Sequence, residues 1–461
     1  MQQKDSWLLP EGIEEILPED AKHLENLRSR FLELFASWGY ELVIPPFIDF
    51  LDSLLTGSGH DLELQTFKLT DQLSGEMLGV RADMTPQVAR IDAHNLKHEW
   101  PTRLCYVGTI LHTRGDPLEK TRSPMQCGAE LYGHAGQESD IEVIRLMLET
   151  LAMTGLQNVH LDLGHVGIYR ALAEQAGLSN SQESKLFNVL QRKARPELRE
   201  LMDSYDIDPN LKNMLLKLPE LNGAKEIIAK AGDVFAKAND KVKKALSDLS
   251  AIAEQLALRF PALPISFDLA ELRGYHYHTG VVFAAFVPTI GREIARGGRY
   301  DNIGGVFGRA RPATGFSADL KLLSTLNKQL YDIDKRELIF APYLDDADLN
   351  ERIREIRTQQ RAVVQGLPGQ TGTPEDMGCT AMLERDNQRN WVITSLASVN
   401  MPGVAQPSAS VQSSAIAPGI ALPPASVQSS AIAPGIALPP ASVQSSAIAP
   451  GIALPPASVQ S

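Results

Sequence analysis

The sequence predicts a protein of the α+β class, in which an antiparallel sheet is flanked by helices. Apolar residues recur at helical spacing in several separate segments, which predicts amphipathic helices. Between them, β-branched and aromatic runs are broken by turn-forming residues, as in antiparallel hairpins. A long helical stretch divides the strand-rich regions, and a small mixed segment follows. We therefore expect a sheet with a helical insertion and a small α/β C-terminal appendage.

The first predicted elements are a helix and a short strand. Apolar residues of 24–38 repeat at helical spacing, and Gly39 follows where a left-handed residue would end the helix. Residues 40–44 have the composition of a strand, which should stop at Pro45-Pro46 because proline cannot donate into a central ladder.

Two hairpins are expected next, in 65–85 and 103–132, where turn formers such as Ser74-Gly75 break the apolar runs. Helical spacing returns in 139–153, and a short strand at 159–163 precedes a further helix.

The second half of the chain should contain three further parts. Residues 178–260 are rich in Lys, Glu, Leu and Ala at helical spacing, and strand patterns resume at 265–269 and 275–286. Residues 336–396 have the pattern of a small α/β domain. The expected division is a sheet core in two parts, 1–177 and 263–330, with a helical insertion at 178–262 between them. The appendage is expected at 336–396 and the tail at 397–461.

The tail has no charged residue from Ala397 onward, and the unit ASVQSSAIAPGIALPP occurs three times in tandem. Proline and glycine recur too often for a helix pair or a strand ladder, so we expect a disordered, dispensable segment. The alternative is a docking segment that uses its scattered Ile, Leu and Val side chains.

Composition argues against several classes of protein. The net charge of −12 disfavours a broad surface for polyanions such as tRNA. The three cysteines include no CxxC pair, so neither a disulfide framework nor a thiolate zinc site is indicated. The N-terminal residues lack the apolar core of a secretory signal, and no apolar run reaches membrane-spanning length. We expect a cytoplasmic protein without membrane contact.

Polar side chains at alternating positions form the first candidate site. If both segments are extended, the members of each of two sets share one face of a strand: Arg81, Asp83 and Thr85, and Gln126, Gly128 and Glu130. This would direct two carboxylates and two neutral polar groups into one pocket, with room for a ligand over the glycine. The alternative is the ordinary solvent face of an antiparallel sheet.

A second candidate is the ring-rich segment 273–280, in which His276 and His278 would share a strand face. Such a pair could hold zinc, but no third ligand stands at a recognisable spacing, so we predict no metal and favour an amino-acid pocket. The glycine-rich stretch 297–308 lacks the ending of a phosphate-binding loop.

These segments, in this order, resemble the catalytic core of histidyl-tRNA synthetase over residues 9–323. The helix, strand and Pro45-Pro46 look like the class II dimer motif, which implies self-association. Residues 103–130 look like the second class II motif, and 312–316 look like the entry to the third. Arg273 to Gly280 resembles the histidine-specific RGLDYYTG, and Gly297 to Asp301 matches GGRYD.

The phosphate-binding arginines of the family are missing. The second motif of the synthetases reads like Phe-Arg-His-Glu, whereas residues 111–114 here are Leu-His-Thr-Arg, and the arginine of the third motif falls on Leu322. Leucine cannot replace a fork of donors on a phosphate, so the resemblance implies no catalytic residue and no adenylation.

The amino-acid pocket of the family is largely kept. Asp83 stands for a family glutamate, and a tyrosine that faces the ring has become His278, which puts the ring contact in doubt. The resemblance implies that Glu130 accepts from the imidazole and that Arg273 contacts the carboxylate. The residues implied for histidine binding are Asp83, Thr85, Gln126, Glu130, Arg273, Tyr277 and His278.

A kept ligand pocket, a lost phosphate clamp and a shortened C-terminal domain are together similar to the regulatory subunit of the short-form ATP phosphoribosyltransferase, a non-catalytic relative of the synthetases. That resemblance implies a hetero-oligomer with the catalytic subunit, histidine as ligand, no cofactor and no tRNA. In this family the regulatory chain activates the first step of histidine biosynthesis and mediates feedback inhibition. The alternatives are a stand-alone histidine sensor and an active synthetase that uses Arg114 or Arg122.

Overall fold

The computed structural model describes residues 8–55, 60–115, 121–272, 274–275, 277–288, 290–326 and 337–396. Arg273, His276 and the tail 397–461, on which three of the expectations above depend, lie outside the described residues.

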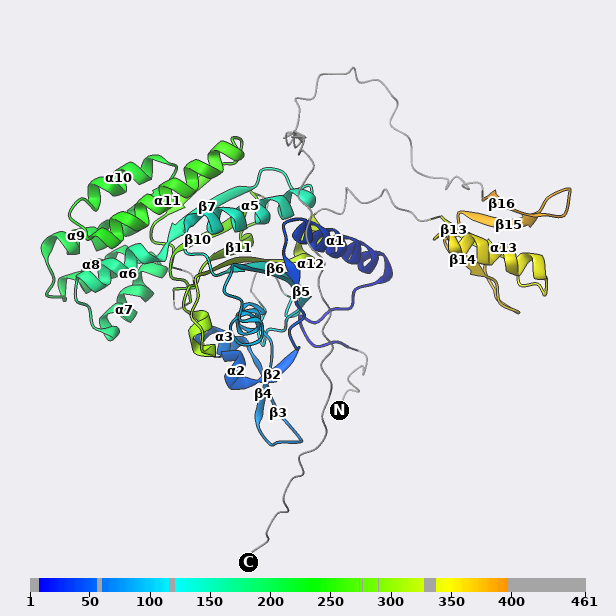
Figure 1. Ribbon diagram of the computed structural model, residues 1–461, viewed down its shortest axis with the longest axis horizontal. Coiled ribbons are helices and arrows are strands. Elements are labelled where there is room, and N and C mark those ends of the chain that lie inside the picture. The colour runs from blue at the N-terminus through cyan, green and yellow to red at the C-terminus, as the bar shows by residue number, and fades with distance from the viewer. Residues whose placement is uncertain are drawn as a thin grey trace, which may run out of the picture. The chain divides into compact units, whose positions relative to one another are not determined.

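A large mixed sheet forms the centre of the fold (Figure 1). Its strand order is β1-β5-β6-β12-β11-β10-β7-β9-β8. Most pairs are antiparallel, while β1–β5 and β7–β9 are parallel. The strands are β1 (Glu41–Leu42), β5 (Thr102–Thr109), β6 (Met125–Tyr132), β7 (His160–His165), β8 (Asn222–Gly223), β9 (Ile265–Asp268), β10 (Val281–Phe286), β11 (Glu293–Arg299) and β12 (Ala313–Asp319). The α+β class expected from the sequence is confirmed.

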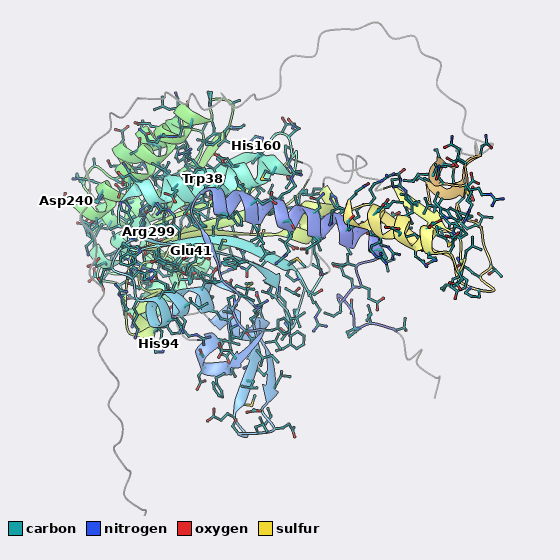
Figure 2. The ribbon with its side chains drawn as sticks, turned by 45° about the vertical axis from the view of Figure 1, so that its right-hand side comes forward. Trp38, Glu41, His94, His160, Asp240 and Arg299 are labelled. Carbon is teal, nitrogen blue, oxygen red and sulfur yellow. The ribbon has the colours of Figure 1, made fainter. Side chains whose placement is uncertain are left out.

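Helices cover one face of this sheet. Inward-facing residues of β6 and β12, such as Ala129 and Phe316, share a core with α1 (Pro18–Ser37) and α5 (Gln137–Met153). Gly39 has a φ of 80° just after α1, as expected for the left-handed residue that ends a helix. Arg299 (Figure 2) donates to Asp140 and Ser139 at the start of α5, so it joins the end of β11 to this layer.

Residues 48–96 form a second, smaller layer. Strands β2 (Ile48–Phe50), β4 (Met77–Val80) and β3 (Phe67–Thr70) form a three-stranded antiparallel sheet. The helices are α2 (Leu51–Leu55), α3 (His60–Gln65), α4 (Thr85–Arg90) and the π-helix Ile91–Leu96. In place of the strand expected at 40–44, the structure has the two-residue strand β1, and the next strand, β2, begins after Pro45-Pro46.

The stretch expected to be a helical insertion is mainly helical and also contains the short edge strand β8. After α6 (Val166–Gln175) it contains α7 (Asn180–Gln191), α8 (Arg195–Asp203), α9 (Pro209–Lys217), the 3-10 turn Leu218–Glu220, α10 (Glu226–Val234) and α11 (Asp240–Arg259). These helices gather at the β7, β9 and β8 end of the sheet (Figure 1). The core strands then continue to a 3-10 turn at Ile303–Phe307 and to α12 (Leu320–Leu326).

The C-terminal segment has its own small core. Its four strands pair in the order β14-β13-β15-β16, with α13 (Ala347–Thr358) packed against them. The strands are β13 (Leu338–Ala341), β14 (Ala362–Gln365), β15 (Ala381–Arg385) and β16 (Trp391–Ser395). None of the helices in the described part of the chain is both long and apolar enough to cross a membrane.

Candidate functional site

A cavity of about 410 Å³ lies on the face of the large sheet that is opposite α5. The alternation of β6 creates this division, because Cys127, Ala129 and Leu131 point into the core while Gln126 and Glu130 line the cavity. Asp83, Thr85, Gln126, Glu130, Tyr277 and His278 all line this one cavity, so the structure brings together every described member of the predicted set.

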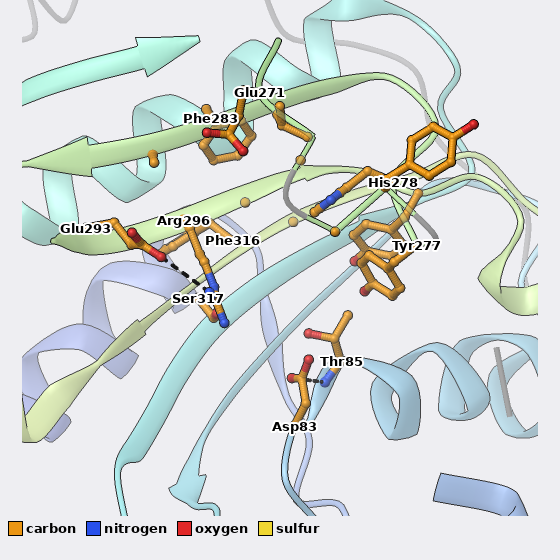
Figure 3. A pocket seen from close by; sticks show the side chains of 18 of the residues that line it. Asp83, Thr85, Glu271, Tyr277, His278, Phe283, Glu293, Arg296, Phe316 and Ser317 are labelled. Carbon is orange, nitrogen blue, oxygen red and sulfur yellow. Dashed lines mark hydrogen bonds and ion pairs between the residues drawn. The ribbon is translucent and has the colours of Figure 1, made fainter. Parts of the chain in front are cut away.

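Asp83 (Figure 3) and Gln126 form one polar corner of the cavity. Asp83 Oδ1 accepts from Gln126 Nε2 at 2.8 Å and from the backbone N–H of Thr85 at 3.0 Å. Gln126 Oε1 in turn accepts from the backbone N–H of Met84 at 2.9 Å. These bonds fix the Asp83 carboxylate while leaving Oδ2 without a hydrogen bond from a described residue.

The route by which Asp83 and Thr85 reach the cavity differs from the prediction. We expected an extended strand through residues 81–85, but β4 ends at Val80 and α4 begins at Thr85. Arg81 does not line the cavity: it is buried and donates to the carbonyls of Pro45 and Thr109 at 2.7 and 2.9 Å. The alternation argument was therefore wrong for this segment, although two of its three residues do line the cavity.

Glu130 lies at the centre of a group of hydroxyls. Its Oε1 accepts from Tyr106 at 2.9 Å and from Thr85 at 3.0 Å, and its Oε2 accepts from Tyr300. The side chain is 1% exposed. A carboxylate offers about four acceptor positions. Among the described residues three are used, so one position on Oε2 remains for an N–H donor.

Two glycines on the same face serve this group in different ways. A Cβ on Gly315, which pairs with Glu130 across the ladder, would lie 1.5 Å from Glu130 Oε2, so this glycine makes room for the carboxylate. A Cβ on Gly128 would lie 2.6 Å from the Tyr106 hydroxyl. We expected a ligand over Gly128, and this was wrong, because Tyr106 fills that space.

Burial raises the pKa of Glu130 to about 8, although the hydroxyl donors act in the opposite direction. Burial also raises the pKa of the Tyr106 and Tyr300 hydroxyls well above their usual value. At neutral pH the empty site therefore holds Glu130 mostly protonated among neutral tyrosines. A cationic or hydrogen-bond-donating ligand would recover the charge of this carboxyl group.

Residues 274–275 and 277–280 form turns and a loop, and β10 begins only at Val281, so His278 does not lie on the strand that we expected. The expected partner His276 lies outside the described residues. The His278 ring packs over Gly298, where a Cβ would lie 2.7 Å from His278 Cδ2. Tyr277 stacks on Tyr300 with ring centroids 4.8 Å apart. Both side chains thus form a wall of the cavity beside Glu130.

The charges that line the cavity are mainly negative. The described lining includes one guanidinium, that of Arg296, and, besides the mostly protonated Glu130, five carboxylates: Asp83, Asp162, Asp268, Glu271 and Glu293. Burial lowers the pKa of the lining residue His112, whose Nε2 lies 3.0 Å from the carbonyl oxygen of Ala82. Such a lining favours a ligand with a positive group and disfavours a triphosphate.

The residues at the positions of the missing phosphate clamp do not supply a substitute in the described structure. Arg122 is turned away, since it donates to the carbonyls of His112 and Glu11, and Arg114 does not line the cavity. Leu322 of α12 packs against the main core. Within the described ranges, no three His, Cys, Asp or Glu side chains gather as a metal ion would require.

Several residues in or next to the cavity were missed from the sequence. Tyr300 is part of the GGRYD segment, which was recognised without a role for the tyrosine, and it forms both a hydrogen bond to Glu130 and the stack on Tyr277. Tyr106 and Arg296 come from strands whose order in the sheet the sequence does not show. The pairing of Tyr106 with Gly128 across β5 and β6 would have been the signal.

The fold and the site define a protein of the histidyl-tRNA synthetase class. The family model described as histidyl-tRNA synthetase matches residues 12–323, and that of the ATP phosphoribosyltransferase subunit HisZ C-terminal domain matches 336–394. The chain belongs to the family of ATP phosphoribosyltransferase regulatory subunits. Relatives with that name include one from Methylococcus capsulatus, 57% identical over 86% of this chain and 97% of its own length. Another, from Thioalkalivibrio sulfidiphilus, is 55% identical over 86% of this chain and 100% of its own length.

Solved structures agree with this assignment. An ATP phosphoribosyltransferase regulatory subunit/histidyl-tRNA synthetase from Bacillus halodurans has a TM-score of 0.72 at 28% identity, over 82% of this chain and 97% of its own. The histidyl-tRNA synthetase from Nostoc has a TM-score of 0.66 at 16% identity, over 85% of this chain and 97% of its own, which shows the fold alone.

Proposed function

We propose that this chain is the histidine-sensing regulatory subunit of an ATP phosphoribosyltransferase, which activates the catalytic subunit and mediates feedback inhibition by histidine. Family membership supports the regulatory role. The cavity itself supports histidine as the ligand. In it the fixed carboxylate of Asp83 and the buried carboxyl group of Glu130 lie beside aromatic rings, and the described lining has no phosphate clamp.

Each part of histidine has a matching group in this proposal. Asp83, held by Gln126, receives the α-ammonium group, and the remaining acceptor position of Glu130 receives an imidazole N–H. Tyr277 and His278 enclose the ring. The resemblance implies Arg273, which lies outside the described residues, as one partner of the carboxylate.

The chain does no chemistry in this proposal. Adenylation places negative charge on phosphates, and removing one preorganised donor from such a site typically costs a factor of about 100 to 1,000. Neither Arg114 nor Arg122 lines the cavity, and the five lining carboxylates other than Glu130 would repel a triphosphate. We therefore place catalysis in a separate subunit of a hetero-oligomer and expect no tRNA partner. The cytoplasmic location remains a prediction.

Self-association through the segment around Pro45-Pro46 is part of the same proposal. Leu42, Ile44 and Phe47 are exposed there, and Ile44 is 81% exposed. Exposed apolar side chains grouped in this way are typical of an interface between proteins.

Arg81 supplies a physical connection between the cavity and this segment. Its backbone lies two residues before Asp83, while its guanidinium donates to the Pro45 carbonyl at 2.7 Å. A ligand that shifts the Asp83 loop would therefore act on the apolar segment through one buried side chain. A coupling of about 1 to 3 kcal/mol between histidine and the quaternary arrangement is the usual size of an allosteric effect.

Isothermal titration of the purified chain with histidine tests the ligand. We expect binding that Glu130→Ala weakens strongly, whereas Glu254→Ala, which removes an exposed carboxylate of α11, leaves the affinity unchanged. Absence of binding at millimolar histidine would refute the assignment of the cavity.

Two further measurements separate the rival functions. A robust histidine-dependent pyrophosphate exchange would favour an active synthetase. Purification from the native cell without a tightly associated catalytic chain would favour a stand-alone sensor.

A further inference from the structure

Arg296 stands on the cavity floor among small neighbours. On β11 it shares a face with Gly298, and its partners across the ladders are Ser317 of β12 and Ala284 of β10. Because these neighbours are short, the arginine rises above them, and its side chain is 69% exposed within the cavity lining. In Figure 3 it extends from β11 over Ser317, toward the part of the cavity that contains Asp83 and Thr85.

The guanidinium is only loosely held by the protein. Its Nη1 lies 3.3 Å from Glu293 Oε1, three residues earlier in the chain, which is a long ion pair at an exposed position. Such a contact contributes little and can be exchanged for a carboxylate of a ligand at small cost.

Arg296 also lies near the corner that we assign to the α-ammonium group. His112 lines the same cavity, and its pKa is lowered by burial, raised by the charge of Asp83 and lowered by the charge of Arg296. The charges of Asp83 and Arg296 therefore both act on His112. Asp83 and Arg296 form a pair of opposite charges that complements the zwitterionic end of a free amino acid.

The strand register gives the scale of the site. Glu130 pairs with Gly315, Gly315 pairs with Gly298, and Arg296 follows two residues along β11. Two strand spacings and two residues place the Cα atoms of Glu130 and Arg296 about 12 Å apart. Their side chains extend from the same face, so the space between carboxyl group and guanidinium suits one amino acid, with its ring at Glu130 and its carboxylate at Arg296.

We propose that Arg296 makes the cavity selective for an ionised α-carboxylate, so that free histidine binds in preference to its amides, esters and the decarboxylated amine. The proposal rests on the histidine site proposed above and adds a group of the described structure that would distinguish the free amino acid from its derivatives. Among the described lining residues, one guanidinium beside Glu293 matches one negative charge, whereas a polyphosphate would meet the surrounding carboxylates.

The test compares two ligands on three proteins. Histidine and histidinamide, which differ in the charge of one group, are titrated into wild type, Arg296→Gln and the control Arg292→Gln. Arg292 precedes β11 and does not line the cavity, so this control removes a nearby positive charge from outside the ligand site.

We expect Arg296→Gln to lower the affinity for histidine by about tenfold to a hundredfold, as for loss of a charged hydrogen bond, and to change the affinity for histidinamide by less than about twofold. Arg292→Gln should change both affinities by less than about twofold. Equal losses for both ligands, or no loss for either, would overturn the proposal. The proposal would also be overturned if inorganic phosphate bound to wild type but not to Arg296→Gln, and did so without competing with histidine. If wild type binds no histidine, the proposed function itself fails, and this result is distinct from the others.

Discussion

Replacing Glu130 with glutamine tests the buried carboxyl group at the centre of the site. Glutamine resembles the protonated acid in shape but cannot ionise. In the wild type the pKa rises from the ordinary 4.5 to about 8 on folding, mainly through burial. Between these values the folded state binds more protons than the unfolded state, so the free energy of unfolding falls as the pH rises. The contribution is complete below pH 4.5 and is lost as the pH approaches 8.

The magnitude follows from the two pKa values. Integrating the proton difference from pH 5 to pH 8 gives a loss of roughly 3 to 4 kcal/mol in the wild type, and none at this position in Glu130→Gln. Urea unfolding of both proteins at several pH values measures the difference between them. The wild type should lose stability relative to the variant by that amount. A difference that stays constant with pH would refute the raised pKa.

Three further predictions concern the site and the apolar segment. Histidine binding should take up nearly one proton well above pH 8, where Glu130 of the empty site is ionised, and almost none at pH 7, where Glu130 already carries the proton that the imidazole receives. Calorimetry in buffers of different ionisation enthalpy measures this proton uptake. An uptake that is the same at both pH values would count against the arrangement. Gly315→Ala should destabilise the fold by about 1 to 3 kcal/mol and weaken histidine binding, because its Cβ would lie 1.5 Å from Glu130 Oε2; unchanged thermal unfolding would contradict this. Ile44→Asp should shift the oligomer toward monomer in sedimentation experiments while thermal unfolding in dilute solution changes little, since Ile44 is 81% exposed; an unchanged oligomer would exclude this segment as the interface.

The periodicity of the sequence predicted some, but not all, of the elements that form the site. Alternation in 125–132 correctly placed Gln126 and Glu130 on one face, because β6 is a regular strand with a buried opposite face. The same argument failed for residues 81–85. Pro86, which is typical of the first turn of a helix, indicated that the chain would leave the strand there.

The close contacts around Glu130 could not be predicted, because they depend on strand order. Tyr106 and Glu130 come from β5 and β6, and Tyr300 directly follows β11. Only the pairing of strands in the sheet brings the two hydroxyls and the carboxyl group together. The place left by Gly128 illustrates the difficulty. A missing side chain in a sequence does not show whether a ligand or a neighbouring tyrosine fills the space.

The C-terminal appendage was easier to predict, because its core is formed within a short segment. Apolar residues of β13, α13, β14, β15 and β16 form one cluster of their own, and the order of these elements along the chain already gives an α/β pattern. The α/β pattern expected for 336–396 agrees with the strand β13 followed by the helix α13.

The activity of the catalytic subunit, measured with and without this chain over a range of histidine concentrations, tests the regulatory role most directly. We expect the chain to raise the rate of phosphoribosyl transfer and histidine to inhibit the complex, with inhibition shifted to much higher histidine by Glu130→Ala. A rate that the chain does not change, or inhibition that Glu130→Ala leaves intact, would contradict the account.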